Sequence, residues 1–210
     1  MIIDLWSIPV YKESTEHTWS RFSDKQRDKL LELQKDSEDN VGLSHNVVIK
    51  SKGLLLDDPI FKDIRELIIS HALKYKNDVM LCENELEMQS SWFTVNKKGQ
   101  SHDFHKHRHT IFSVCYYPKV KSGDIVLEAP DGKNAFMKDY CFGFKYSGVN
   151  SYNCSMWTIP LVSGDIVIFP GHMSHGSSEN NSDTDRYMIG ANFWLRGEMK
   201  FYDELDRIKA

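Results

Sequence analysis

The spacing of apolar residues changes near residue 85 and divides the chain into a helical part and a strand-rich part. Residues 18–35 carry charges on most faces with a few apolar side chains among them, which predicts a helix that lies on the surface. In residues 60–75 apolar side chains recur at helical spacing, directly after two aspartates and a proline that suit the first turn of a helix. This second helix should pack its apolar stripe on a sheet, and a short strand is expected before both helices, around residues 2–11.

From residue 85 onward, short apolar runs are separated by glycine, aspartate and asparagine. Repeated short strands of this kind predict a β-sandwich or jelly roll rather than a parallel α/β sheet. We expect a single domain over residues 1–210 that is mainly β with flanking helices. A double-stranded β-helix (jelly roll) core at residues 85–197 would follow the N-terminal strand and helices of residues 1–84 and precede a tail at residues 198–210. The predicted strands lie in LEMQSSWFTVN, HTIFSVCYYP, SGDIVLEAP, SMWTIPLVSGDIVIFP and RYMIGANFWL.

Length, charge and cysteine content narrow the class of protein. A chain of 210 residues can form one domain with an ordinary core, and its net charge of -4 gives no general attraction to nucleic acid or to an anionic membrane. No apolar run approaches the length of a membrane span, and the N-terminal residues lack the features of a signal peptide. We therefore expect a soluble, cytoplasmic protein. The four cysteines form no CxxC pair and are expected to be unpaired thiols: Cys82, Cys115, Cys141 and Cys154.

Six of the nine histidines lie in two short segments, which suggests a metal site. His105 and His107 are separated by one residue, so on a β-strand their side chains would project from the same face and could supply two ligands. His175 follows SGDIVIFPGHM, a pattern that predicts a strand, a turn and the start of the next strand, and it could supply a third ligand. Three ligands on one face of an octahedral metal leave positions open, as in non-haem iron(II) oxygenases, although imidazole also suits zinc, copper and nickel.

The predicted site has two alternative ligand sets, one with a carboxylate and one with histidines alone. Such triads usually contain two histidines and one carboxylate, and His107 stands where the carboxylate would be expected. Either Asp103 is the acidic ligand beside His105, or the site uses histidines alone. We favour the all-histidine set, because three neutral ligands are workable once a dicarboxylate cosubstrate adds its own charge. Three other histidines are expected to be ordinary surface or core residues: His17, His45 and His71. The remaining three could be surface residues, or they could orient the ligands or contact substrate: His102, His109 and His172.

Arg186 lies 186 − 175 = 11 residues after the third candidate ligand, with a turn-forming segment at 180–184 between them. If the two positions are on adjacent antiparallel strands, the guanidinium would point into the same barrel as the metal, at a deeper level. There it could pair bidentately with one carboxylate of a short dicarboxylic keto acid whose other end reaches the metal. The alternative is a surface charge beside Asp183 and Asp185.

These residues and the segments around them resemble the 2-oxoglutarate/Fe(II)-dependent oxygenase family of bacteria and phages, in its prolyl hydroxylase-like branch. The resemblance covers most of the chain and runs in order through LWSIPVY, SSWFTVNKKG, HKHRHTIFSVCYYP, SGDIVLEAP, VSGDIVIFPGHMSH and RYMIGANFW. Two departures concern the entrance of the site: Val114 follows Ser113 where similar proteins have glycine, and Arg108 stands where they often have proline.

The resemblance implies a dioxygenase that uses Fe(II), 2-oxoglutarate and O2, hydroxylates an unidentified substrate and releases succinate and carbon dioxide, with no side chain needed as acid or base. It implies metal ligands at His105, His107 and His175 and a salt bridge from Arg186 to 2-oxoglutarate. It further implies a hydrogen bond from Tyr117 to the far carboxylate, with two polar neighbours and one packing residue nearby, Asn96, Asn192 and Trp92.

Two competing interpretations use the same histidines. One is a cupin-like protein that binds metal without catalysis, and the other is an enzyme that uses three histidines and no keto acid. Arg186 separates them from the oxygenase, because only the oxygenase needs a carboxylate anchor beside the metal. The sequence leaves the substrate open among a protein side chain, a free amino acid and a nucleobase, and it leaves a homodimer open.

Overall fold

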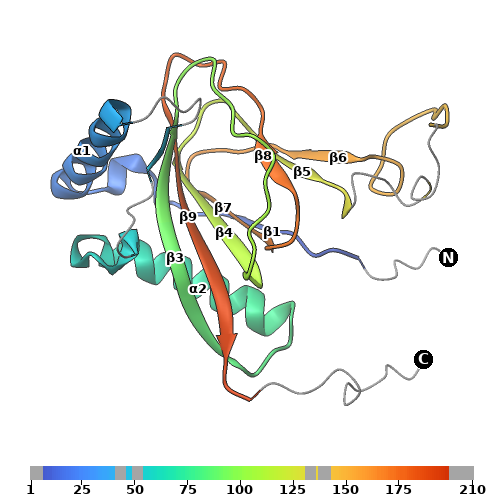
Figure 1. The fold of residues 1–210 in the computed structure, drawn as a ribbon, viewed down its shortest axis with the longest axis horizontal. Helices are drawn as coiled ribbons and strands as arrows, with labels where there is room; N and C mark the ends of the chain where they lie inside the picture. The colour runs from blue at the N-terminus through green and yellow to red at the C-terminus, as the bar shows by residue number, and fades with distance from the viewer. Residues whose placement is uncertain (1–6, 41–45, 49–53, 131–135, 137–142, 199–210) are drawn as a thin grey trace.

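Two antiparallel β-sheets and two α-helices make up the computed structural model, which describes residues 7–40, 46–48, 54–130, 136 and 143–198 (Figure 1). The larger sheet has the order β1-β7-β4-β9-β3-β2 and the smaller sheet the order β6-β5-β8. The strands are β1 (Tyr11–Ser14), β2 (Asn46–Val48), β3 (Glu85–Asn96), β4 (Phe112–Lys119), β5 (Ile125–Glu128), β6 (Met156–Ile159), β7 (Asp165–Pro170), β8 (His175–Ser177) and β9 (Arg186–Arg196). The helices are α1 (Asp24–Asn40) and α2 (Lys62–Asp78), with short 3-10 helices at Trp19–Arg21, Leu55–Asp57 and Pro59–Phe61.

Strand β4 is buried along both faces because each face of the larger sheet is covered. Successive side chains of a strand point to opposite faces. Val114 and Tyr116 pack in the core that the sheet shares with the helices, whereas Cys115 and Tyr117 pack in the core between the two sheets. Strand β7 alternates in the same way. The helices therefore cover one side of the larger sheet, and the smaller sheet covers the other.

Both predicted helices are confirmed, with shifted starting points. The surface helix begins at Asp24, after a 3-10 turn, and ends at Asn40. At the second helix, the Asp58 side chain accepts a hydrogen bond from the Ile60 backbone N–H at 3.1 Å, and Pro59 opens a 3-10 turn that leads into α2. The apolar stripe of α2 is buried against the sheet through Ile64, Ile68, Ala72 and Tyr75.

The opening strand lies later than the sequence suggested. Residues 7–10 have no regular structure, and β1 spans Tyr11–Ser14 at the edge of the larger sheet, where Tyr11 is opposite Ile168 of β7. Residues 2–6 of the expected strand lie outside the described residues. Strand β2, which pairs with β3, was not predicted.

The expectation that His175 and Arg186 lie on adjacent strands is wrong. His175 begins β8 in the smaller sheet, where Leu127 of β5 is its partner, and Arg186 begins β9 in the larger sheet, opposite Asn96 of β3. The segment between them therefore crosses from one sheet to the other (Figure 1). Because the two sheets face each other, both side chains can still reach the space between them.

The predicted fold class, mainly β with flanking helices and a jelly-roll core, is confirmed by these two facing antiparallel sheets. Within the described part of the chain, no helix is long and apolar enough to span a bilayer. Three of the cysteines are free thiols, Cys82, Cys115 and Cys154, whereas Cys141 and also His45 lie outside the described residues.

Candidate metal centre

Three histidines converge at one end of the space between the sheets. His105 and His175 form an isolated antiparallel bridge, in which each backbone N–H donates to the other residue's carbonyl, at 2.9 and 3.0 Å. The backbone N–H of His107 donates to the Gly171 carbonyl at 3.0 Å. One potential ligand atom of each histidine lies within 4.8 Å of the others, and the Nε2 atoms of His105 and His107 are 3.1 Å apart.

The backbone around the first two histidines differs from the expectation. Neither His105 nor His107 belongs to a named strand, and the single bridge to His175 provides the only strand-like pairing described for this segment. The rings converge because backbone hydrogen bonds tie residues 105 and 107 to the segment 171–175. Close approach to the third histidine thus results from the fold rather than from alternation along one strand.

Each histidine ring is held through its Nδ1 atom. The Nδ1 atoms of His105 and His175 lie 2.8 and 2.9 Å from the carbonyl oxygens of Asp103 and Met173. A carbonyl oxygen can only accept, so Nδ1 carries the proton and Nε2 keeps a lone pair for a metal. His107 is held instead by side chains, with Nδ1 2.7 Å from Ser113 Oγ and 2.7 Å from Asn192 Oδ1.

Burial keeps two of the candidate ligands, His107 and His175, neutral at physiological pH. Desolvation lowers the pKa of His107 to about 4, against a raising effect of its hydrogen bond to Asn192 and with a further lowering effect of nearby His105. Desolvation also lowers the pKa of His175 to about 3, with a raising effect of the Met173 carbonyl and a lowering effect of the neighbouring histidines. Neutral imidazole is the form that binds a metal, so these rings need not lose a proton first.

The donor set fits Fe(II). Three imidazoles with ligand atoms within 4.8 Å of one another are a suitable site for a divalent first-row metal. Among the described residues this group of potential ligands contains no carboxylate and so does not include Asp103, the alternative acidic ligand, whose backbone carbonyl contacts His105 Nδ1.

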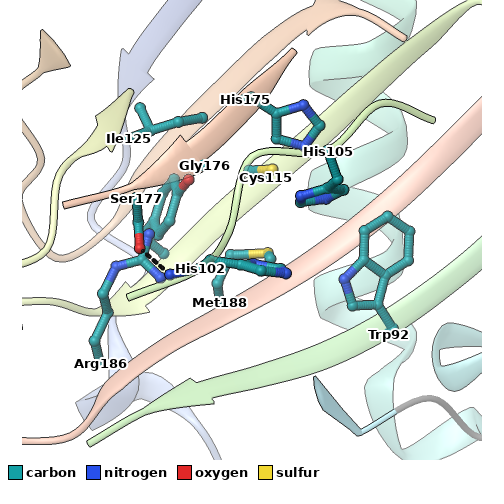
Figure 2. Close-up of a pocket in the computed structure, with 11 residues that line it drawn as sticks. Trp92, His102, His105, Cys115, Ile125, His175, Gly176, Ser177, Arg186 and Met188 are labelled. Atoms are coloured by element: carbon teal, nitrogen blue, oxygen red, sulfur yellow. Dashed lines mark hydrogen bonds between the residues drawn. The ribbon is translucent and has the colours of Figure 1, made fainter. Parts of the chain in front are cut away.

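A pocket between the sheets joins the histidines to Arg186. Its lining includes two of the three histidines, His105 and His175, as well as Tyr117, Arg186 and apolar side chains such as Ile125. Figure 2 shows the Arg186 side chain and the rings of His105 and His175 entering this space from different segments. The pocket therefore borders both the metal site and the guanidinium.

Arg186 is a buried cation that pairs with no carboxylate of the described residues. Arg186 is only 3% exposed. Its Nε atom donates to the Gly123 carbonyl at 2.6 Å, and its Nη1 atom donates to Asn96 Oδ1 at 2.9 Å. Both partners are neutral, so the positive charge is solvated by dipoles alone. A buried charge is costly unless it is paired, and a bound carboxylate would supply the missing partner. The alternative of a surface charge beside Asp183 and Asp185 does not match this burial.

Tyr117 and Asn96 surround the guanidinium. The Arg186 Cζ atom lies 4.9 Å from the centre of the Tyr117 ring, which is a favourable cation–π distance. Burial raises the pKa of Tyr117 well above its usual value, so the phenol keeps its proton and can act as a donor. Asn96 is buried, and within the described part of the chain its Nδ2 group has no hydrogen-bond partner. A buried donor without a partner is unusual and is consistent with a ligand that completes the site.

Other residues have positions that the sequence did not specify. Asn192 contacts His107 rather than Arg186, and Trp92 both lines the pocket and packs edge-on against His107, with ring centres 5.2 Å apart. His102 also lines the pocket, and its ring centre is 4.5 Å from that of His105. Ser113 was not predicted as a site residue. Its only signal in the sequence was its place on a strand directly after the histidine pair.

Comparisons with known proteins agree with this geometry. A family model described as "Putative 2OG-Fe(II) oxygenase" matches residues 90–192, which include all three histidines and Arg186. No protein of curated function matches the chain in sequence.

Solved structures of low sequence identity share the fold. A prolyl-4-hydroxylase from Pseudomonas putida has 14% identity and a TM-score of 0.53, covering 91% of this chain and 95% of that one. HygX from Streptomyces hygroscopicus, with nickel and 2-oxoglutarate bound, has 13% identity and a TM-score of 0.57, covering 89% and 82%. A Trichoplax adhaerens prolyl hydroxylase, in complex with a peptide fragment of hypoxia inducible factor, has 11% identity and a TM-score of 0.56, covering 89% and 83%.

Proposed function

This chain belongs to the 2OG-Fe(II) oxygenase family, whose members use 2-oxoglutarate and O2, and we propose that it hydroxylates a C–H bond of its substrate with release of succinate and carbon dioxide. The observation that carries this proposal is the buried Arg186, which has no described carboxylate partner and lines the same pocket as His105 and His175, two of the three clustered histidines. A cupin-like metal protein without a keto acid would have no use for such a buried guanidinium.

In this proposal His105, His107 and His175 hold Fe(II) through their Nε2 atoms. Arg186 pairs with the far carboxylate of 2-oxoglutarate, and Tyr117 donates a hydrogen bond to the same group. Asn96 holds the guanidinium in place through its Oδ1 atom, 2.9 Å from Nη1, and its Nδ2 group has no hydrogen-bond partner among the described residues. When bound, the iron and its cosubstrate supply the oxygen activation and the hydroxylation chemistry.

The cosubstrate offsets most of the positive charge of the site. Three neutral imidazoles leave the two positive charges of Fe(II) uncompensated, and Arg186 adds a third at the other end of the pocket. A dianionic keto acid brings one carboxylate to each end. The chain's own residues therefore bind and orient the cosubstrate, and the apolar lining between the two ends, which includes Ile125 and Met188, limits the access of water.

The experiment compares Arg186→Ala and Arg186→Lys with Lys98→Ala, which removes an exposed cation that pairs with Asp183 outside the pocket. Calorimetry under anaerobic conditions would measure Fe(II) and 2-oxoglutarate binding, and succinate formation would be followed in air. Loss of a buried charge pair costs about 2–5 kcal/mol, so Arg186→Ala should weaken 2-oxoglutarate binding by roughly 30-fold or more while Fe(II) binding stays close to wild type. Unchanged 2-oxoglutarate binding in Arg186→Ala would contradict the proposal.

A further inference from the structure

The ring of His107 is held differently from the rings of the other two histidines. His105 and His175 donate from Nδ1 to backbone carbonyls two residues earlier in the chain, a contact that the local backbone provides. His107 contacts two side chains from distant strands, Ser113 of β4 and Asn192 of β9, each at 2.7 Å from Nδ1. The third side of this triangle is a hydrogen bond from Ser113 Oγ to Asn192 Oδ1 at 2.8 Å.

The direction of these hydrogen bonds determines which nitrogen of His107 is protonated. Asn192 Oδ1 has two lone pairs and no proton, so it accepts from both neighbours. Nδ1 of His107 must then be the donor, and Nε2 is left with its lone pair. That lone pair lies on the side of His105, whose Nε2 is 3.1 Å away, at the point where the three candidate ligand atoms meet. The proton position of a ligating histidine is set by the partner of its other nitrogen.

The sheet places these two side chains in register. Ser113 and Asn192 are directly opposite each other on β4 and β9, so their side chains emerge on the same face, toward the pocket. Two residues before Asn192 on β9, Gly190 leaves room for the Trp92 ring, because an added Cβ would lie 2.4 Å from the Trp92 Cε2 and Cζ2 atoms. Trp92 then packs edge-on against His107. Four residues from three strands thus form a cradle that fits a planar ring.

We propose that Ser113 and Asn192 are positioning residues that fix His107 as its Nδ1–H tautomer, and that this cradle makes position 107 specific for imidazole rather than for a carboxylate ligand. The inference rests on the proposed function for the metal site itself. It goes further by assigning a role to two side chains that need not touch either iron or 2-oxoglutarate. A carboxylate at position 107 would face the acceptor Asn192 Oδ1 and would leave the space beside Trp92 unfilled.

The first test needs no metal. Long-range proton–nitrogen correlation spectra of the metal-free protein with nitrogen-labelled histidine report the tautomer of each ring, and His107→Gln identifies the signals of residue 107. Wild type should show His107 with its proton on Nδ1. The double variant Ser113→Ala/Asn192→Leu should show the Nε2–H form, whereas Asn192→Asp, which keeps an acceptor, should retain Nδ1–H. A pure Nδ1–H tautomer in the double variant would overturn the proposal.

A matched control and single variants separate this role from a general loss of stability. Ser91→Ala removes another buried hydroxyl, which accepts from the Leu56 N–H at 2.9 Å on the helix side of β3, and it should leave the His107 tautomer unchanged. If circular dichroism shows that the double variant is unfolded, the tautomer of His107 is measured in the two single variants, Ser113→Ala and Asn192→Leu, instead. Some Nε2–H form in either one supports the proposal, and pure Nδ1–H in both contradicts it.

The second test measures Co(II) binding by visible absorption. Loss of the partner that orients a ligating histidine typically weakens metal binding by roughly 10–100-fold, and the double variant should fall in this range. Asn192→Asp should recover most of the affinity, and His107→Asp should bind Co(II) more weakly than wild type. Wild-type affinity in the double variant or in His107→Asp would overturn the positioning role, whereas a wild-type protein that binds no Co(II) would contradict the proposed metal site itself.

Discussion

Replacement of Gly123 with alanine should weaken 2-oxoglutarate binding, although Gly123 has no side chain to offer a ligand. Its φ is +90°, and a Cβ at this position would lie 2.8 Å from Cδ and 3.3 Å from Nε of Arg186. Its carbonyl also accepts the hydrogen bond from Arg186 Nε at 2.6 Å. A methyl group there must therefore displace the guanidinium from the position in which Gly123 and Asn96 hold it.

Two contributions to the effect can be separated. The left-handed backbone costs alanine about 1–2 kcal/mol of folding free energy wherever it occurs. Displacement of Arg186 weakens its hydrogen bonds, and hydrogen bonds to charged groups contribute about 1.5–3 kcal/mol. If this loss appears in cosubstrate binding, the dissociation constant rises by roughly 10–100-fold.

Gly99→Ala is the matched control, because its φ is +81° and an added Cβ has no heavy atom within 4 Å. In urea titrations both variants should lose a similar amount of unfolding free energy, because alanine is strained in the left-handed backbone conformation. Gly123→Ala should lose more, because its Cβ also displaces Arg186. Only Gly123→Ala should lose affinity for 2-oxoglutarate in anaerobic calorimetry, and both should bind Co(II) like wild type. Equal 2-oxoglutarate affinity in the two variants would refute the link between residue 123 and the guanidinium.

Three further predictions concern the pocket. In the folded protein the pKa values of His107 and His175 are about 4 and about 3, below the usual 6.5. Between pH 6.5 and pH 4 the unfolded chain therefore binds more protons than the folded protein, so the unfolding free energy of the metal-free protein should fall as the pH is lowered over this range. A pH-independent stability in urea titrations over that range would argue against neutral buried ligands. Gly190→Ala should destabilise the protein by about 1–3 kcal/mol, measured in the same way, because its Cβ would lie 2.4 Å from the Trp92 ring, and a neutral effect would mean that this ring is free to move. Tyr117→Phe should keep the ring beneath Arg186 but weaken 2-oxoglutarate binding by roughly 2- to 10-fold through loss of one hydrogen bond. Unchanged affinity in calorimetry would show that the Tyr117 hydroxyl does not bind 2-oxoglutarate.

The strands of the core could be predicted because both of their faces are buried. Alternate residues of β4 enter different cores, so the run IFSVCYYP is apolar except for Ser113, and IVIFP in β7 is apolar throughout. Helix α2 could be predicted from its apolar spacing and from the Asp58 and Pro59 start signal. These are local properties of the chain, which depend on residues close together in sequence.

The sheet to which each strand belongs could not be predicted. A turn between His175 and Arg186 has the same composition whether it joins neighbours in one sheet or crosses between two sheets. Although the predicted strand arrangement was wrong, His175 and Arg186 still line the same pocket, because the two sheets face each other. The bridge between His105 and His175, which replaces the expected strand at the histidine pair, is likewise a contact between distant segments.

The surroundings of His107 depend on register, which the sequence does not state. Ser113 and Asn192 are 79 positions apart and meet only because β4 and β9 pair with these residues opposite each other. The resemblance to known oxygenases implied a place for Asn192 near the cosubstrate, whereas its side chain contacts the metal-site histidine. Such contacts follow from the paired strands and need a structure to be seen.

The central claim is that three histidines and Arg186 bind the two ends of one iron–cosubstrate complex. A crystal structure of the protein prepared anaerobically with Fe(II) and 2-oxoglutarate tests it most directly. We predict a metal bonded to Nε2 of His105, His107 and His175, with one carboxylate of 2-oxoglutarate on Arg186. A metal bound through Asp103 in place of His107, or a cosubstrate with no carboxylate at Arg186, would contradict it.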